Sequence, residues 1–175
     1  REPQLLAGIV SDMRVINGQR GKLAIFKLDD KSGVIEATAD EAVINANRNL
    51  LKDDELVIVM AKMQPDRFSG GFRLNVQQVW DLASARCRFG KYLKVAVNGR
   101  APDIQRLVRE FPPQVVESEQ GTLVRGLPER LAVHRETATA ELQLGEEAKF
   151  FPTDAALASW MAQADKGLAQ IVYEV

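Results

Sequence analysis

Apolar and polar residues alternate with a period of two in five segments of the first 82 residues, and short turns separate the segments. This period is typical of β-strands with one buried face and is incompatible with an amphipathic helix. In the second segment, Ala24, Phe26 and Leu28 alternate with Lys27, so we expect the three apolar side chains to point inward. The predicted strands are 5–15, 23–28, 34–39, 56–63 and 72–82.

The first strand has two faces of different character. We assign Ala7, Ile9, Met13 and Val15 to its apolar face, opposite Gly8, Asp12 and Arg14. The turns that follow the first two strands carry Gly, Asn and Asp, residues that tolerate tight turn geometry. Asp40 is a good N-cap for a helix over 41–51, because its side chain can accept a backbone N–H of the first turn. Three strands, a helix and two strands are the order of an OB-fold, a five-stranded Greek-key barrel.

The second half of the chain has a different pattern. A helical connector is predicted over 83–91, and strands at 92–97, 131–134, 138–144, 148–151 and 168–173 alternate with helices at 103–111 and 154–164. The order βαβββαβ predicts a small α+β domain. We therefore expect a mainly β domain over 1–82, the connector, and an α+β domain over 92–175.

Composition excludes several kinds of active site. The single Cys87 and single His134 rule out an internal disulfide and the usual zinc ligand sets. Paired carboxylates at 29–30 and 53–54 lie in predicted turns, where Asp hydrogen-bonds to nearby backbone, so we interpret them as turn residues and not as metal ligands. No apolar run approaches the length of a membrane span. Residues 1–91 carry 14 Lys and Arg against 12 Asp and Glu, and residues 92–175 carry 9 against 12, so neither half is strongly basic.

The basic residues of the first half fall where an OB-fold binds single strands. That path crosses the second and third strands between the loops that join strands one to two and four to five. A basic groove with an aromatic ring for base stacking suits single-stranded nucleic acid. The alternative is that these are ordinary solvated charges and that Phe68 packs on its own loop. The candidate residues are Arg14, Arg20, Lys22, Lys27, Lys62, Arg67, Phe68 and Arg73.

Several segments resemble a known family. They are residues 21–30 (GKLAIFKLDD), 66–71 (DRFSGG) and 79–86 (VWDLASAR). Together they resemble the OB-fold and following segment near the C-terminus of the alpha subunit of bacterial DNA polymerase III. The first segment is also shared with the anticodon-binding domains of class II tRNA synthetases. The resemblance covers residues 5–91 well and the second half only through its order of elements.

The resemblance implies a fragment of a DNA-directed DNA polymerase, a cytoplasmic nucleotidyltransferase that uses a divalent metal. The OB-fold would bind single-stranded template, and the last domain would bind the tau subunit of the clamp loader within the polymerase III holoenzyme. Phe151, Trp160 and Met161 are candidates for that protein contact, or are simply core residues. The fragment itself is expected to hold no catalytic residues and no cofactor. The alternative function is an RNA-binding OB appendage of a tRNA synthetase-like translation enzyme, which explains only the first 40 residues.

Overall fold

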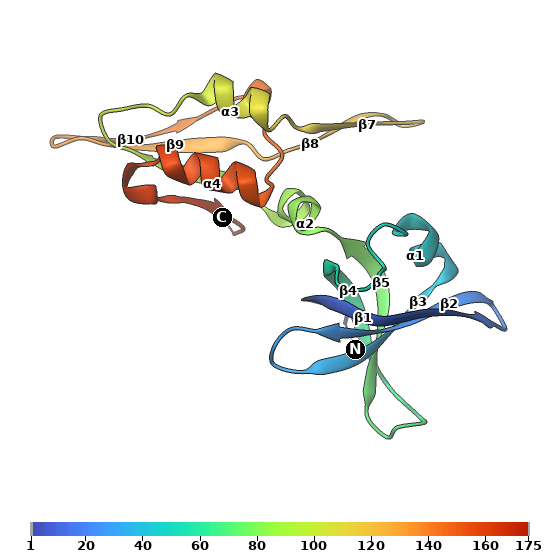
Figure 1. Ribbon diagram of the computed structural model, residues 1–175. Coiled ribbons are helices and arrows are strands. Elements are labelled where there is room, and N and C mark those ends of the chain that lie inside the picture. Colours follow the sequence, from blue (N-terminus) through green and yellow to red (C-terminus); the bar gives the residue numbers. More distant parts are fainter. Residues whose placement is uncertain (1, 175) are drawn as a thin grey trace. The chain divides into compact units, whose positions relative to one another are not determined.

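The computed structural model describes residues 2–174 and divides into two compact units, with the boundary after Leu82. The first unit is a closed barrel in the strand order β1-β2-β3-β5-β4 (Figure 1). All neighbouring strands are antiparallel except β3 and β5, which are parallel. The elements are β1 (Gln4–Gly18), β2 (Gly21–Asp29), β3 (Val34–Asp40), α1 (Glu41–Ala46), β4 (Leu56–Pro65) and β5 (Phe72–Trp80). This confirms the predicted OB-fold.

The barrel interior is filled as the alternation predicts. Ala24, Phe26 and Leu28 of β2 are buried, and Phe26 is the largest side chain in this core. Facing strands contribute mainly Val, Leu and Ala. Because β-branched and small side chains fit a pleated inner surface closely, they fill the narrow barrel, and the buried Thr38 hydroxyl donates to the Leu74 carbonyl.

The first strand contradicts the predicted faces before residue 12, whereas Met13 points inward as predicted. Gly8 and Val10 point into the barrel, whereas Ile9 and Val15 are 44% and 51% exposed. A Cβ at Gly8 would lie 2.6 Å from Cγ of Leu28, so glycine lets β1 approach β2 closely here. Between the pairs Ser11–Lys27 and Arg14–Ile25, two residues of β1 oppose one of β2. This β-bulge, with Asp12 at a φ of 51°, reverses the alternation and turns Met13 inward.

Helix α1 is shorter than the predicted 41–51. Asp40 caps its start as expected, with its carboxylate accepting the Val43 N–H at 3.0 Å. The helix ends at Ala46 because Asn47 leaves helical geometry, and its side-chain amide donates to the Val43 carbonyl at 3.0 Å. Turns then carry the chain to β4, with Leu51 buried in the barrel core. An asparagine that satisfies a helix carbonyl is a strong local stop.

The second unit holds a four-stranded sheet in the order β10-β9-β6-β11, with β6 and β9 parallel. Its core gathers Leu93, Val95, Leu107, Phe150 and Trp160. The predicted strand over 148–151 is not formed, since Phe150 makes only an isolated bridge to Leu127. The elements are α2 (Leu82–Phe89), β6 (Tyr92–Val97), α3 (Ile104–Glu110), β7 (Gln114–Ser118), β8 (Gly121–Arg125), β9 (Glu129–His134), β10 (Thr139–Gln143), η1 (Glu146–Ala148), α4 (Asp154–Gln163), η2 (Asp165–Gly167) and β11 (Ala169–Val172).

A hairpin that the sequence did not predict lies between α3 and β9. Strands β7 and β8 form a separate two-stranded sheet that projects from the body of its unit (Figure 1). All ten of its residues are exposed. Neither strand of the hairpin has an apolar face buried in the core. The alternation of apolar and polar residues, which reveals half-buried strands, therefore did not predict it.

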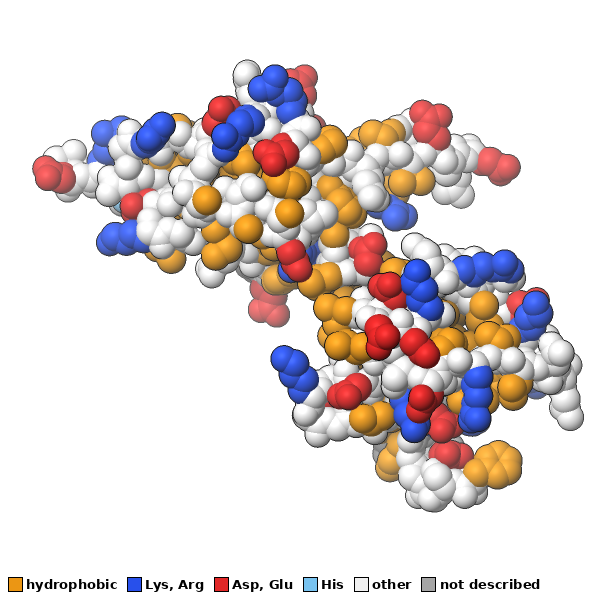
Figure 2. Space-filling view, viewed as in Figure 1, with side chains coloured by type: hydrophobic (Ala, Val, Ile, Leu, Met, Phe, Trp, Pro, Cys, Tyr) orange, Lys and Arg blue, Asp and Glu red, His pale blue; other side chains and the backbone are white. Residues whose placement is uncertain are grey.

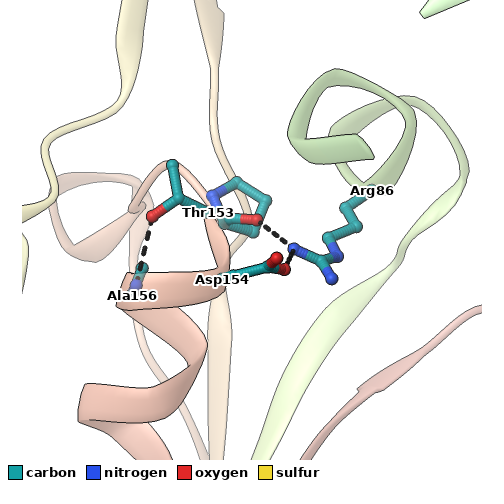
Figure 3. Close-up of polar contacts among 5 residues, drawn as sticks. Arg86, Thr153, Asp154 and Ala156 are labelled. Carbon is teal, nitrogen blue, oxygen red and sulfur yellow. Dashed lines mark hydrogen bonds and ion pairs between the residues drawn. The ribbon is translucent and has the colours of Figure 1, made fainter. Parts of the chain in front are cut away.

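Helix α2 is held within the second unit by one arginine. Nη1 of Arg86 lies 2.9 Å from the Pro152 carbonyl and 2.8 Å from Oδ1 of Asp154 (Figure 3). These groups stand at the start of α4, where the Thr153 hydroxyl caps the helix through the Ala156 N–H. The Arg86 side chain is only 15% exposed. Its buried position strengthens a charge-assisted hydrogen bond of this kind.

Candidate nucleic-acid interface

The loop between β4 and β5 is organised by one carboxylate. Asp66 accepts the Phe68 N–H at 3.0 Å through Oδ1 and the Ser69 hydroxyl at 2.8 Å through Oδ2. The backbone of Asp66 closes the loop, accepting from Gly70 and donating to Gly71. The Phe68 hydrogen bond is the main cause that lowers the pKa of Asp66, with Ser69 and nearby Arg73 adding to it. The loop therefore keeps one shape without packing on the barrel.

Phe68 stands on this loop almost fully in water. Its exposed fraction is 96%, the largest of the exposed apolar side chains. The alternative in which this ring packs on its own loop is therefore wrong. Arg67 precedes it and Arg73 lies at the start of β5, opposite Gln64 of β4. The hairpin tip that carries Arg67 and Phe68 extends beyond the barrel in Figure 1.

A second group lies on the outer face of β1 and β2 beyond the bulge. A pocket of about 250 Å³ is lined there by Asp12, Arg14, Ile25, Phe26, Lys27 and Glu36. Arg14 stands opposite Ile25, and Lys27 stands opposite Glu36 of β3. Two of the predicted residues, Arg14 and Lys27, are thus brought together on adjacent strands.

Sequence reasoning missed the acidic residues of this face. Nζ of Lys27 lies 3.0 Å from Oδ2 of Asp12, and both side chains are more than half exposed. Glu36 lies between Ile35 and Ala37 in a strand pattern, so the sequence could have predicted that it points outward. The bulge that brings Asp12 to Lys27 could not be predicted in this way. Exposed pairs of this kind are weak and screened by salt. Figure 2 likewise shows acidic and basic side chains interspersed over the barrel unit.

The remaining predicted residues lie at other places on the barrel. Arg20 lies in the β1–β2 turn, and Lys22 lies at the start of β2, where its N–H donates to Oε2 of Glu41 at 3.3 Å. This turn meets the end of β3, because Leu23 pairs with Asp40. The β4–β5 loop meets the opposite end, because β5 runs parallel to β3. The two loops therefore bracket the outer face of β2 and β3, with about 17 Å of β2 between Lys22 and Lys27.

Lys62 is the outlier of the predicted set. It pairs with Asn75 on the outer side of β4 and β5, since its neighbour Ala61 points into the core. It lies two strands away from Lys27 in the barrel order. Lys62 therefore belongs to the flank of the proposed path and not to its centre.

The predicted protein contacts of the second unit are only partly at the surface. Trp160 is fully buried and packs on Phe150 with ring centroids 5.4 Å apart, so its assignment to an exposed interface is wrong. The neighbouring Phe151 is half-buried and Met161 is 46% exposed. The α4 helix turns Trp160 to the sheet, and Met161, one residue later, falls on the other side.

Asp29 and Asp30 act in their turn as predicted, whereas Asp53 hydrogen-bonds to strand β1, 40 residues away in the chain. Oδ1 of Asp29 accepts the Lys31 N–H, Oδ1 of Asp30 accepts the Ser32 and Gly33 N–H groups, and Oδ1 of Asp53 accepts the Met13 N–H at 2.9 Å. Within residues 2–174, no three His, Cys, Asp or Glu side chains are grouped as metal binding would require. In the same described part of the chain, no helix has the length and apolar character to cross a membrane.

The closed five-stranded barrel defines the first unit as an OB-fold. Residues 5–82 match the family described as an OB-fold nucleic acid binding domain. Nearly the whole chain is also similar to one kind of replication protein. It is 31% identical over 155 residues to the DNA polymerase III subunit alpha of Pseudomonas aeruginosa, covering 88% of this chain and 13% of the relative.

Other relatives carry the same name. The DNA polymerase III subunit alpha of Escherichia coli K12 is 30% identical over 149 residues, covering 85% of this chain and 12% of its own length. The same subunit of Neisseria meningitidis serogroup A is 31% identical over 154 residues, covering 86% of this chain and 13% of the relative. The chain thus spans about an eighth of the relatives it matches. A solved structure of a replication protein A heterotrimer bound to ssDNA covers 85% of this chain and 40% of its own, with 19% identity and a TM-score of 0.38, too weak a likeness to bear on function.

Proposed function

We propose that this chain is an accessory region of a bacterial replicative DNA polymerase and that its OB-fold binds single-stranded template DNA. The observation that carries the proposal is Phe68, 96% exposed at the tip of a loop that hydrogen bonds hold in one shape. A preformed aromatic platform loses little conformational entropy on binding, and base stacking on such a ring is tolerant of sequence.

The path of the strand follows the outer face of β2 and β3. Arg67 and Arg73 supply positive charge at one end and Arg20 at the other, with Arg14 and Lys27 between them. Asp12 and Glu36 on the same face reduce the net attraction for phosphate. Binding is therefore expected to be weak and strongly dependent on salt.

In this proposal the parent chain is a cytoplasmic DNA-directed DNA polymerase, a metal-dependent nucleotidyltransferase whose catalytic residues lie outside this fragment. Similarity to subunit alpha over 85–88% of the chain supports it. The second unit then binds the tau subunit of the clamp loader within the holoenzyme. Support for a protein contact there is limited to exposed apolar side chains, among them Met161.

The test of strand binding uses fluorescence anisotropy with a labelled 12-nucleotide oligo(dT) over a series of salt concentrations. Arg14→Ala, Arg20→Ala, Arg67→Ala and Arg73→Ala should each weaken binding and flatten the log-affinity against log-salt slope by about 0.7. Lys94→Ala, an exposed change in the second unit, serves as the matched control. Unchanged slopes in all four barrel variants would reject this path.

The same titration separates DNA from RNA. The proposal expects oligo(dT) to bind at least as tightly as oligo(rU) of equal length, and either to bind more tightly than duplex DNA. A clear preference for RNA would favour the translation-enzyme alternative, because only the 2′-hydroxyl distinguishes the two backbones at a given site.

Calorimetric titration of the chain with tau tests the second unit, with Met161→Ser as the variant and exposed Leu142→Ser as control. Absence of measurable binding would reject that part of the proposal.

A further inference from the structure

The N-terminal half of β1 and the first half of β4 present an apolar outer face. Three consecutive cross-strand pairs make up this β1–β4 face: Leu5 with Met60, Ala7 with Ile58 and Ile9 with Leu56. The alternate residues of both strands, including Val10, Val57 and Val59, fill the core. The six face residues therefore serve no purpose in the barrel interior.

The face is open to solvent at its strand ends. Leu5, Ile9 and Leu56 are 46%, 44% and 45% exposed, and Ala7 is exposed as well. Apolar side chains that meet in direct pairs form a contiguous patch, whereas a soluble surface normally scatters them singly. Such patches mark sites where another molecule binds.

A pocket adjoins this face. Its volume is about 230 Å³, and its lining includes Leu6, Ala7, Val34 and Ile35 with Asp30 beside them. Ala7 belongs to both the pocket and the β1–β4 face, so the two form one continuous apolar surface. A concave pocket beside a flat patch is the arrangement in which one large side chain of a partner supplies most of the binding energy.

The rim of the surface is acidic at the end where Ile9 pairs with Leu56. Asp29 stands opposite Ile9 on β2, and Asp30 follows it. Next to Leu56 the chain carries Asp53, Asp54 and Glu55. Lys31 and Lys52 are the basic residues next to these five carboxylates in the sequence, and Lys62 follows Met60 at the other end of the outer side of β4. The side-chain hydrogen bond from Ser32 is the main cause that lowers the pKa of Asp30, so its carboxylate stays charged at neutral pH.

The acidic rim and the apolar centre select one kind of occupant. A polyanion such as DNA is repelled here, and a second copy would bring one acidic rim against another. We propose that the β1–β4 face binds an amphipathic segment of a partner protein, with apolar residues against the sheet, one large apolar side chain in the pocket, and Lys or Arg residues along the rim. This surface is distinct from the proposed strand path, from which the bulge at Asp12 separates it along β1.

The test uses two labelled synthetic peptides of 14 residues. The first is an amphipathic helix with Leu on one face and Lys on the other, and the second has every Lys replaced by Glu. The full chain should bind the Lys peptide at least ~10-fold more tightly than the Glu peptide. Ile9→Ser combined with Leu56→Ser should weaken binding of the Lys peptide by at least ~10-fold, because it removes apolar contact and keeps the acidic rim.

Two controls make the result specific to this surface. Val15→Ser lies on the same strand beyond the bulge, at a residue 51% exposed, and should leave peptide binding unchanged. Both variants should bind oligo(dT) as the natural sequence does, which shows that they are folded and separates this inference from the proposed strand binding. A single Ala7→Arg variant, which places bulk and positive charge at the centre of the face, should also weaken binding.

Four outcomes would overturn the inference. Equal affinity for both peptides, or equal affinity of the natural chain and the Ile9→Ser, Leu56→Ser variant, would show that the surface binds no such segment. A dimer in sedimentation velocity that the double variant abolishes would assign the surface to a second copy. Binding to phosphatidylcholine vesicles that the same variant abolishes would assign it to lipid.

Discussion

The exposure of Phe68 is the reason for proposing that this residue binds a ligand. An apolar ring that contacts water over nearly its whole surface adds nothing to the core, and its loop is held by Asp66 and Ser69 instead. The side chain is thus free to bind without cost to the fold.

We expect Phe68→Ala to weaken oligo(dT) binding by about 1 to 3 kcal/mol, the usual loss when a stacking ring is removed. The urea unfolding midpoint should change little, because the ring is 96% exposed. Anisotropy titration and urea unfolding measure the two quantities, and Phe68→Tyr, which keeps the ring, is the matched control. A lower midpoint with unchanged affinity would show that the ring is structural.

Glu129 is a residue of the opposite kind, a carboxyl group inside the second unit. Its side chain is fully buried, and neither oxygen has a hydrogen-bond partner among the described residues. Burial raises the pKa of Glu129 from 4.5 to about 8. The folded chain therefore holds this proton at neutral pH, whereas the unfolded chain releases it.

This difference predicts a pH dependence of stability. Below pH 4.5 this carboxyl is protonated in both the folded and the unfolded chain, so it costs the fold nothing. As pH rises from 4.5 toward 8 the unfolded chain loses the proton first, and the free energy of unfolding falls by about a few kcal/mol. Urea unfolding of the second unit at pH 5 and pH 8 measures it. Glu129→Gln, which is neutral at both values, should remove most of the difference; an equal pH dependence in that variant would show that another group is responsible.

Among the elements, the β7–β8 hairpin has little packing or strand pairing to stabilise it. It pairs with no other strand in the described chain, and Val115, Val116, Leu123 and Val124 are all exposed. An isolated two-stranded hairpin is marginally stable in water, whereas β9 lies between two neighbours and carries buried side chains.

We expect amide hydrogens of β7 and β8 to exchange much faster than those of β9, by a factor of at least ~100, because local opening of the hairpin exposes no core. Hydrogen exchange followed by mass spectrometry or NMR checks this within one sample, with β9 as internal reference. Protection of the hairpin equal to that of β9 would mean that it is covered in solution.

At the scale of the whole molecule, the chain has two separate cores. Phe26 belongs to the barrel cluster and Trp160 to the cluster of the second unit, and no residue is shared between them. Two cores of this size favour two cooperative units.

Phe26→Ala should therefore destabilise the barrel by about 3 to 5 kcal/mol, the cost of removing a buried aromatic ring, and leave the second unit unchanged. Trp160→Ala should do the reverse. Hydrogen exchange of the full chain at increasing urea concentration reports both units together. A parallel loss of protection in both units from either variant would show that they unfold as one.

Much of this architecture was accessible from the sequence. The inward faces of β2, the order of strands and helix in the barrel, the cap at Asp40 and the turn role of Asp29 and Asp30 all follow from local rules. Strand period, turn chemistry and capping act over a few neighbouring residues, so the sequence expresses them directly. The placement of Phe68 on a loop belongs to the same class.

Tertiary structure alone decided the rest. The bulge at Asp12 arises where β1 leaves β4 and continues on β2 alone. Because it shifts the alternation, Met13 points inward as predicted, whereas Ala7 and Ile9 lie on the outer face. Trp160 is buried because α4 packs it on Phe150, which lies ten residues away in the chain, and Glu129 is buried because β9 is a central strand. Periodicity shows that a strand has two faces, but which face is covered depends on the partners that long-range pairing brings to it. Local patterns therefore predict the barrel and its loops, whereas long-range pairing fixes which side chains of those loops and strands remain exposed and able to bind.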